Sequence, residues 1–514
     1  MIVDSPYETE AVKSGTVKLP PQSATVSAHT EAIVLPGDTH TLTGTAGGNN
    51  APGDHFKSDV GYSDMFVHRF GDSIRFCADE GVWLVFDEAK GWQRDTAQAI
   101  RAKAADYARE LRLWALERAK SLPPDEGMKL VASMVCLGNS KRIEPALKFA
   151  QSNPATTIQA IQLDAEPFLV GARNGVIDLR DGSFQPHSPR HLVTRRLGTD
   201  YIPGATAPTW ERFLADVQPE PEMRAFLQRL AGYALTGEVR EHILPFHYGT
   251  GANGKGTYLE HALLKLSGDY GAKLTDSLVY KSQKGHQPHR EIANLCGKRF
   301  ALGEENSEGG KLNESLLKAM TGGDKVKGRF HYANFVEYFP TYKIALVGNH
   351  RPRIDGTDDG IWRRFLLIDW PVQIPTEKRD GQLKDKLAAE MPGILNWAAA
   401  GARDWMQGGL RPPKCCTSAT EAYRAQSDKL AEFIADYFVQ EEGATVTKAV
   451  AYDAYREWAR EAGIDHPASK RFLGFQLAGR GWQETKAGHE RQHYWVNYRL
   501  RGGNIATQDR YADV

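Results

Sequence analysis

Residues 247–257 read HYGTGANGKGT, and the rest of the chain is organised around this stretch. The apolar run before it, residues 243–246, predicts a short buried strand, and apolar spacing over residues 258–266 predicts a helix after it. A glycine-rich loop between a strand and a helix is the context in which this pattern binds phosphate. The alternative is a glycine-rich turn with a surface lysine, which the two flanking elements disfavour. We therefore predict a nucleotide site.

The loop offers both backbone and side-chain groups to a phosphate. Glycines let backbone N–H groups approach a polyanion closely, and the ammonium of Lys255 can reach the outer phosphates. The hydroxyl residue that normally follows the lysine and holds magnesium is replaced by Gly256, so we expect Thr257 to supply that hydroxyl. The predicted ligands are ATP and Mg²⁺, and the loop residues expected to bind them are Gly249, Gly251, Asn253, Gly254, Lys255, Gly256 and Thr257.

The composition excludes several classes of protein. Lys plus Arg and Asp plus Glu both number 64 in 514 residues, so any nucleic-acid contact must be local. The five cysteines show no metal-binding spacing, and the adjacent pair Cys415 and Cys416 favours a reducing compartment. No window reaches the ~18 apolar residues of a membrane span, and the N-terminus has no signal-peptide pattern. We expect a cytoplasmic protein with no membrane contact.

The chain is expected to contain four segments. The first is rich in Ser, Thr, Gly and Pro and shows little periodicity. The second combines a helical pattern over residues 97–122 with an Asn-Gly hairpin at Asn174. The expected segments are a disordered tail at 1–54, a mixed helical and β module at 55–240, an α/β ATPase core at 241–410 and a C-terminal domain at 411–514.

Two further apolar runs end in polar side chains. Residues 298–305 read KRFALGEE, which has the form of a Walker B strand. One of its carboxylates would hold magnesium, which we assign to Glu304, and Glu305 would polarise the attacking water. Residues 342–349 form another predicted strand, ending at Asn349. Because parallel sheets bind ligands at the carboxyl ends of their strands, this asparagine is expected to meet the terminal phosphate and the water; the alternative is an asparagine in an ordinary turn.

A basic segment lies between these strands. Residues 324–335 read DKVKGRFHYANF, with basic residues at alternating positions that a strand would place on one face. A basic hairpin with aromatic neighbours suits a nucleic-acid backbone with stacked bases, although an ordinary solvent-facing hairpin has the same pattern. The residues expected to contact DNA are Lys325, Lys327, Arg329, His331 and Tyr332.

Two arginines, Arg363 and Arg364, precede the next predicted strand. Either guanidinium could stabilise charge on a transferring phosphoryl group, in its own subunit or in a neighbouring one. The alternative is an ion pair with Asp358 or Asp359. The sequence leaves open which arginine acts.

Taken in order, these motifs resemble those of superfamily 3 helicases. The order is GxGxNGK, the strand ending in Glu-Glu, TGGD at 321–324 with its hairpin, GNHRP at 348–352 and WRR at 362–364. More narrowly, the chain resembles the C-terminal helicase half of phage and plasmid primases, which is related to the poxvirus primase-helicase. NGVIDL at 174–179 resembles the module before the ATPase in that family. The resemblance runs from residue 59 to residue 499.

The resemblance implies an AAA+-type P-loop ATPase that assembles as a homo-oligomeric ring, usually a hexamer. Such rings draw one DNA strand through a central channel, typically 3′ to 5′. Larger relatives carry a primase domain, which residues 1–54 are too few to form. We therefore expect no primer synthesis, and a separate primase or replication protein as partner. The implied roles are phosphate binding for Lys255, the Walker B pair for Glu304 and Glu305, the polar sensor for Asn349, the arginine acting in trans for Arg363 or Arg364, and the channel hairpin for residues 325–334.

The C-terminal segment shows a helical pattern over 418–438, two more over 451–462 and 469–480, and a predicted hairpin over 482–498. Helix, helix and hairpin suggest a winged helix, which the resembled family also carries at this place. Its basic residues would contact DNA or would simply be solvated, and the sequence does not decide between these. The residues concerned are Lys470, Arg471, Lys486, His489 and Arg491.

The leading hypothesis is an ATP-dependent DNA helicase that replicates a phage, plasmid or other mobile element in a bacterial host, acting on single-stranded or forked DNA. The second is an origin-binding initiator or loader whose ATP site controls assembly without processive unwinding. The third is a small-molecule kinase, which the GNHRP strand end, the WRR element and the basic hairpin disfavour.

Overall fold

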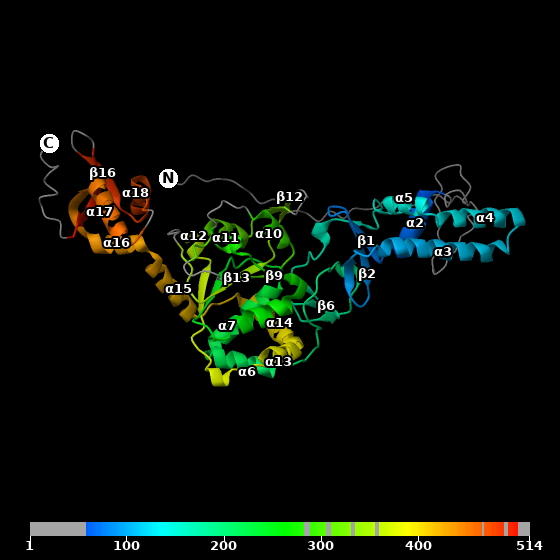
Figure 1. Ribbon diagram of the computed structural model, residues 1–514, viewed down its shortest axis with the longest axis horizontal. Helices are drawn as coiled ribbons and strands as arrows, with labels where there is room; N and C mark the ends of the chain where they lie inside the picture. Colours follow the sequence, from blue (N-terminus) through cyan, green and yellow to red (C-terminus); the bar gives the residue numbers. More distant parts are fainter. Residues whose placement is uncertain are drawn as a thin grey trace, which may run out of the picture. The chain divides into compact units, whose positions relative to one another are not determined.

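The computed structural model describes residues 58–281, 288–304, 310–329, 335–354, 359–464, 467–487 and 492–501 (Figure 1). The predicted tail at 1–54 lies outside these residues. Contacts divide the chain into two compact units, 1–83 with 95–158 and 84–94 with 159–514. Within the described part, no helix is long and apolar enough to cross a bilayer.

The first unit is mainly helical. Its longest helix, α3, covers Ala99–Ala119, which confirms the pattern predicted over 97–122. The buried face of α3 packs with α2 and α5, and the rings of Tyr62 and Tyr107 stack with centroids 6.4 Å apart. The other elements are α2 (Asp59–Phe70), β1 (Ile74–Cys77), α4 (Pro124–Leu137), α5 (Ser140–Ala150) and β4 (Thr157–Ile158), with β1 and β4 paired in parallel.

The second unit begins with short antiparallel strands. The predicted Asn-Gly hairpin is confirmed, because β5 (Leu169–Ala172) and β6 (Gly175–Asp178) pair across Asn174. The side chain of Asn174 holds the loop by hydrogen bonds to the backbone of Tyr201. The remaining elements here are β2 (Val82–Asp87), β3 (Gly91–Arg94), η1 (Ala160–Gln162), β7 (Phe184–Gln185) and η2 (Pro189–His191).

A parallel five-stranded sheet forms the centre of the second unit, with the strand order β14-β8-β13-β10-β9. The strands are buried along most of their length, as expected for a sheet that is covered on both faces. The structure therefore confirms a mixed α/β fold with a parallel sheet. The strands are β8 (Leu244–Tyr248), β9 (Gly271–Lys273), β10 (Phe300–Glu304), β13 (Lys343–Gly348) and β14 (Phe365–Asp369).

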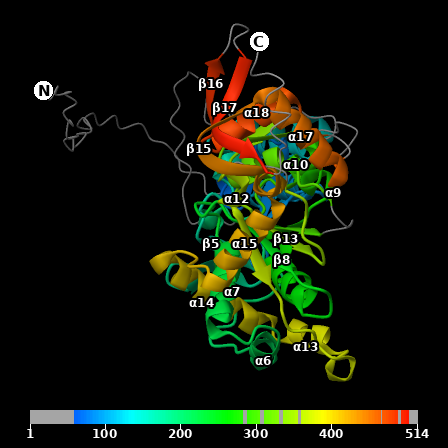
Figure 2. The same ribbon diagram turned by 90° about the vertical axis from the view of Figure 1, so that its left-hand side faces the viewer.

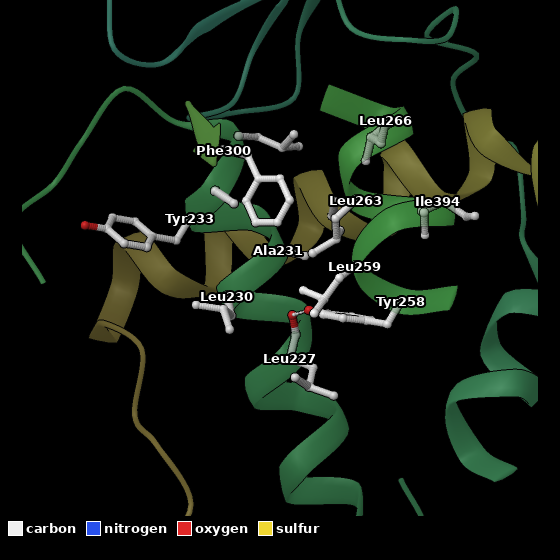
Figure 3. Close-up of a cluster of buried hydrophobic side chains, with 14 of the residues drawn as sticks. Leu227, Leu230, Ala231, Tyr233, Tyr258, Leu259, Leu263, Leu266, Phe300 and Ile394 are labelled. Atoms are coloured by element: carbon white, nitrogen blue, oxygen red, sulfur yellow. Dashed lines mark hydrogen bonds between the residues drawn. The ribbon is translucent and has the colours of Figure 1, made fainter. Parts of the chain in front are cut away.

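One face of this sheet is covered by the helices that precede and follow it. Figure 3 shows apolar side chains of the helix after β8 meeting those of α7, and Tyr258 donates a 2.8 Å hydrogen bond to the carbonyl of Leu227. Helices α7 and α14 touch closely, since a Cβ added at Gly232 would lie 2.0 Å from the backbone nitrogen of Ala402. The elements are α6 (Pro208–Val217), α7 (Pro221–Leu235), η3 (Thr257–Leu264), α8 (Lys265–Ser267), η4 (Gly268–Tyr270), η5 (Thr376–Lys378), α13 (Leu383–Ala389) and α14 (Met391–Gly408).

A second apolar cluster covers the opposite face. Successive residues of β10 alternate between the two clusters, with Leu302 in the first and Ala301 in the second, as the period of a strand requires. The elements on this side are α9 (Asp276–Val279), α10 (His289–Asn294), α11 (Glu314–Thr321), β11 (Val326–Arg329), β12 (Phe335–Tyr338), α12 (Asp359–Trp362) and α15 (Lys414–Ser427).

The C-terminal part corrects one prediction. The single helix expected over 418–438 is wrong, because Asp428 leaves the helical region (φ −85°, ψ 73°) and its side chain caps the next helix. A strand, β15 (Phe438–Thr447), follows and was not predicted. Figure 2 shows the β15-β17-β16 sheet beside α17 and α18. The other elements are α16 (Lys429–Tyr437), α17 (Lys448–Glu461), α18 (Lys470–Gly479), β16 (Gln483–Ala487) and β17 (Gln492–Leu500).

Candidate nucleotide-binding site

The loop between β8 and η3 follows the carboxyl end of a central strand. Its backbone enters the left-handed region at Gly251 (φ 102°), Ala252 (φ 49°) and Gly254 (φ 86°). Glycine is required at the last of these positions, since a Cβ there would lie 2.9 Å from Val217 and 3.0 Å from Phe213. The helix begins immediately afterwards, at Lys255. The predicted order of strand, loop and helix is thus confirmed.

Lys255 is only 5 % exposed, and its ammonium lies inside this loop. Its Nζ donates to the carbonyl of Gly249 at 2.6 Å, to Oδ1 of Asn253 at 3.1 Å and to Oδ1 of Asn349 at 3.2 Å. Burial lowers the pKa of Lys255 to about 8. A partly desolvated ammonium attracts phosphate more strongly than a solvated one, because water screens it less. The ammonium thus lies beside Asn349, which directly follows β13.

Glu304 lies at the same edge of the sheet. The parallel register pairs Glu304 with Val347 of β13, and Gly348 with Tyr248 of β8. The ends of the three strands are therefore neighbours, with β13 in the middle. Glu305, the second predicted carboxylate, lies outside the described residues.

Two charged residues that the sequence did not single out join Glu304. The Nζ of Lys273, at the end of β9, lies 2.5 Å from Oε1 of Glu304 and 3.3 Å from Oε2 of Glu260. Glu260 is on the helix that follows the loop, and a Cβ added at Gly256 would lie 3.8 Å from its Oε1. Neither residue is conspicuous in the sequence. Lys273 ends a three-residue edge strand, and Glu260 lies one helical turn after Gly256.

His247 lies buried beneath the loop. It accepts a 3.1 Å hydrogen bond at Nδ1 from Nε1 of Trp370, and its ring packs between Trp370 and Tyr258. Burial, together with the charge of Lys255, lowers the pKa of His247 to about 3. The imidazole is therefore neutral in the folded chain at every pH above that value.

His247 should make stability dependent on pH. Its unfolded pKa is about 6.5, so between pH 6.5 and 3 the unfolded chain binds a proton that the folded chain does not, and stability falls as pH falls. Lowering the pH from 7.5 to 5 should therefore cost wild type about 2 kcal/mol more than His247→Gln. Urea unfolding at both pH values measures this difference. Equal pH dependence in wild type and His247→Gln would contradict the prediction.

The basic hairpin forms as expected. Its strands β11 and β12 pair antiparallel, and Lys327 and Arg329 point away from the buried residues of β11. The aromatic neighbours are also present, with Phe335 48 % exposed and both cations 5.3 Å from its ring centroid. An acid lies opposite, because Oε1 of Glu337 is 3.1 Å from Nζ of Lys327. His331 and Tyr332 lie outside the described residues.

The two arginines differ in their surroundings. Arg363 is exposed. Arg364 is half-buried and donates a 2.7 Å hydrogen bond to the carbonyl of Gly360, and burial and the charge of Arg363 lower its pKa. Asp359, one of the two acids considered as partners, lies 2.5 Å from the guanidinium of Arg424. Asp358 lies outside the described residues.

Three family models match the chain in succession. Residues 63–219 match the model described as D5 N terminal like, residues 247–364 match a family of unknown function, DUF5906, and residues 425–498 match the model described as Poxvirus D5 protein-like. The second match contains the loop, the Glu304 strand, the hairpin and Asn349. The first and third place D5-type segments on either side of it.

Similar curated proteins are viral. "Putative helicase L207/L206" of Acanthamoeba polyphaga mimivirus is 28% identical over 58% of this chain and 33% of that protein. "Putative primase C962R" of African swine fever virus (strain Badajoz 1971 Vero-adapted) is 25% identical over 58% of this chain and 34% of that protein. "Primase D5" of Fowlpox virus (strain NVSL) is 26% identical over 48% of this chain and 32% of that protein. The matches span about a third of these relatives' lengths.

Among solved structures, the NrS-1 C terminal region aligns over 86% of this chain and 99% of that chain, at 10% identity and a TM-score of 0.46. The D5-type models and the named relatives carry the assignment, and they confirm the resemblance first drawn from the motifs. Over these segments the chain resembles the D5-type helicase–primase family of superfamily 3.

Proposed function

We propose that this chain is the ATP-dependent DNA helicase part of a replication protein, built on an AAA+-type P-loop core. The observation that carries the proposal is the contact between Lys255 of the loop and Asn349 of the adjacent strand, beside the end of the Glu304 strand. A buried ammonium, a polar amide and a carboxylate at one sheet edge are the groups that phosphoryl transfer to water requires.

The residues at this edge fit ATP and Mg²⁺. A glycine-containing loop with left-handed backbone and a buried ammonium suits phosphates, and a carboxylate at a strand end suits a hard cation. Bound magnesium would neutralise charge on the phosphate oxygens. In this proposal the loop and Lys255 hold the phosphates, Glu304 holds the metal with Thr257 as a further oxygen donor, and Glu305 polarises the attacking water.

The strand order supports the proposed roles of the loop, Asn349 and Glu304. Strand β13 lies between β8 and β10, so Asn349 is between the phosphate loop and Glu304. An amide there is suited to orient the water against the terminal phosphate. Arg363, which is exposed, is better suited than the half-buried Arg364 to reach a nucleotide in a neighbouring subunit. We therefore propose a homo-oligomeric ring, a hexamer, with Arg363 acting in trans.

The hairpin residues Lys325, Lys327 and Arg329 would contact the DNA backbone in the channel of that ring, with exposed Phe335 available to stack on a base. The C-terminal part would add a winged helix, since α16, β15, α17, α18 and the β16–β17 hairpin follow one another in that order. Lys470 and Arg471 are exposed at the start of α18. We propose that this C-terminal part also contacts DNA.

Removing the hairpin charges should uncouple hydrolysis from DNA. In Lys327→Ala and Arg329→Ala the ratio of ATP hydrolysis with single-stranded DNA to that without it should fall towards one, because a phosphate contact is lost. Each change should also lower the salt dependence of DNA binding by about one unit of log–log slope. The control is Lys378→Ala, an exposed lysine in η5. Normal DNA stimulation in both hairpin variants would show that the channel assignment is wrong.

Strand displacement on a forked duplex at low salt tests the proposed function, with Lys255→Ala as the control. Displacement that needs ATP and is lost in the control supports a helicase, and substrates with 3′ or 5′ tails then give its direction. Hydrolysis without displacement would favour the initiator or loader. The names of the viral relatives support a role in DNA replication. We also propose that the chain acts in replication of a mobile element in a bacterial host, with a separate primase as partner.

A further inference from the structure

Lys273 connects three elements around the metal-binding carboxylate. It ends the edge strand β9, which pairs in parallel with β10 and places Lys273 opposite Leu302. From there its Nζ reaches Oε1 of Glu304 at 2.5 Å and Oε2 of Glu260 at 3.3 Å. One ammonium thus holds together carboxylates from the helix after the loop and from the Walker B strand.

These contacts are weak enough to exchange. The side chains of Lys273, Glu260 and Glu304 are 54 %, 34 % and 36 % exposed, and ion pairs this exposed contribute about 0.2–1 kcal/mol. The lysine is therefore a counter-ion that another cation can displace at small cost.

Glu260 also adjoins the place where the usual hydroxyl is missing. A Cβ added at Gly256 would lie 3.8 Å from Oε1 of Glu260, whereas the other oxygen, Oε2, faces Lys273. A serine or threonine at 256 would carry its hydroxyl from that Cβ. The carboxylate thus borders both the glycine and the lysine.

We propose that Lys273 is a positioning residue that competes with magnesium for Glu304 and Glu260, so that magnesium must displace the ammonium when it binds with nucleotide. The two cations compete for this carboxylate, because they repel each other at close range and magnesium needs its full set of oxygen ligands. Glu260 then supplies negative charge beside Gly256. This inference rests on the proposed ATPase function.

A magnesium titration of nucleotide binding tests the competition. The full chain is mixed with a fluorescent ADP analogue at fixed concentration, and bound fluorescence is followed as MgCl₂ is added. Lys273→Met should lower the half-saturating magnesium concentration by about 1.4- to fivefold, since about 0.2–1 kcal/mol of competing interaction is removed. Lys273→Arg keeps the charge and should restore the wild-type value. Glu260→Gln should raise it, because negative charge is lost.

The matched control is Lys265→Met, an exposed lysine in α8, directly after the helix that carries Glu260, and this variant should titrate as wild type. Binding measured in EDTA should be equal in all variants, which separates the metal effect from nucleotide binding or folding. An unchanged or higher half-saturating concentration in Lys273→Met would overturn the inference alone. A wild-type chain that binds no nucleotide with or without magnesium would overturn the proposed function as well.

Discussion

Lys255→Ala is expected to lower the rate of ATP hydrolysis by about 10²–10³-fold, the loss typical of one well-placed charge or donor that stabilises a transition state. The ammonium is held within the loop by oxygens of Gly249, Asn253 and Asn349, so its charge is fixed at the position where phosphate would lie. Alanine removes both the charge and these contacts. Phosphate release at saturating ATP and magnesium measures the rate.

The control is Lys265→Ala, which changes an exposed lysine ten residues after Lys255 and should hydrolyse ATP as wild type does. The substitution at 255 should not unfold the chain, because it removes a buried charge whose burial lowers its pKa. Circular dichroism melting checks this point. Hydrolysis by Lys255→Ala within tenfold of wild type would mean that the loop is not the phosphate site.

Arg299→Met is expected to destabilise the second unit by about 3–5 kcal/mol, because the loss of this buried guanidinium leaves three backbone carbonyls without their donor. Arg299 is 3 % exposed and lies just before β10. Its guanidinium donates to the carbonyl of Leu235, at the end of α7, and to that of Leu169 in β5, both at 2.8 Å. It also lies over the ring of Tyr270 at 4.7 Å.

Urea unfolding of wild type and variant measures the loss. The control is Arg290→Met, an exposed arginine in α10, which should change stability by less than about 0.5 kcal/mol. Since Arg299 is at the amino end of β10, its loss should act on stability at a distance from the phosphate loop. A loss below 1 kcal/mol would show that water or neighbouring donors replace the guanidinium.

Lys343 is a second buried basic residue at this end of the sheet. Lys343, which begins β13, donates to the carbonyl of Thr236 and, at 3.0 Å, to that of Thr341. Burial and the charge of Arg299 hold the pKa of Lys343 well below its ordinary value. The two side chains fasten the C-terminal end of α7 to the sheet, where a helix end favours positive charge. Neither was recognised in the sequence, where they look like ordinary strand-end lysine and arginine.

Much of the candidate site followed from local pattern. The apolar run before the loop, the glycines within it and the apolar spacing after it predicted β8, the loop and the helix, and all three are present. The rule that parallel strands bind ligands at their carboxyl ends predicted that Asn349 would meet the terminal phosphate and the attacking water, which stays a prediction. The contact that the structure shows is with the ammonium of Lys255. Alternation of charge predicted the exposed face of the hairpin.

Local pattern failed where neighbours came from distant parts of the chain. The break at Asp428 escaped prediction because the apolar spacing continues through it, whereas the cap that forms there depends on backbone geometry. Strand β15 depends on pairing with β17, about fifty residues later. Lys273 belongs to the site only because the sheet order places β9 beside β10.

The sequence by itself predicted the glycine-rich loop and the strands before Asn349 and at Glu304, because each depends on residues within about ten positions of one another. It also carried the resemblance to superfamily 3, because the order of these motifs can be read along the chain. The tertiary structure decided which charges meet. It placed Lys273 between two carboxylates, buried Lys255 against Asn349 and distinguished exposed Arg363 from half-buried Arg364. These are properties of distance and burial between segments, and Coulomb and desolvation energies depend on both.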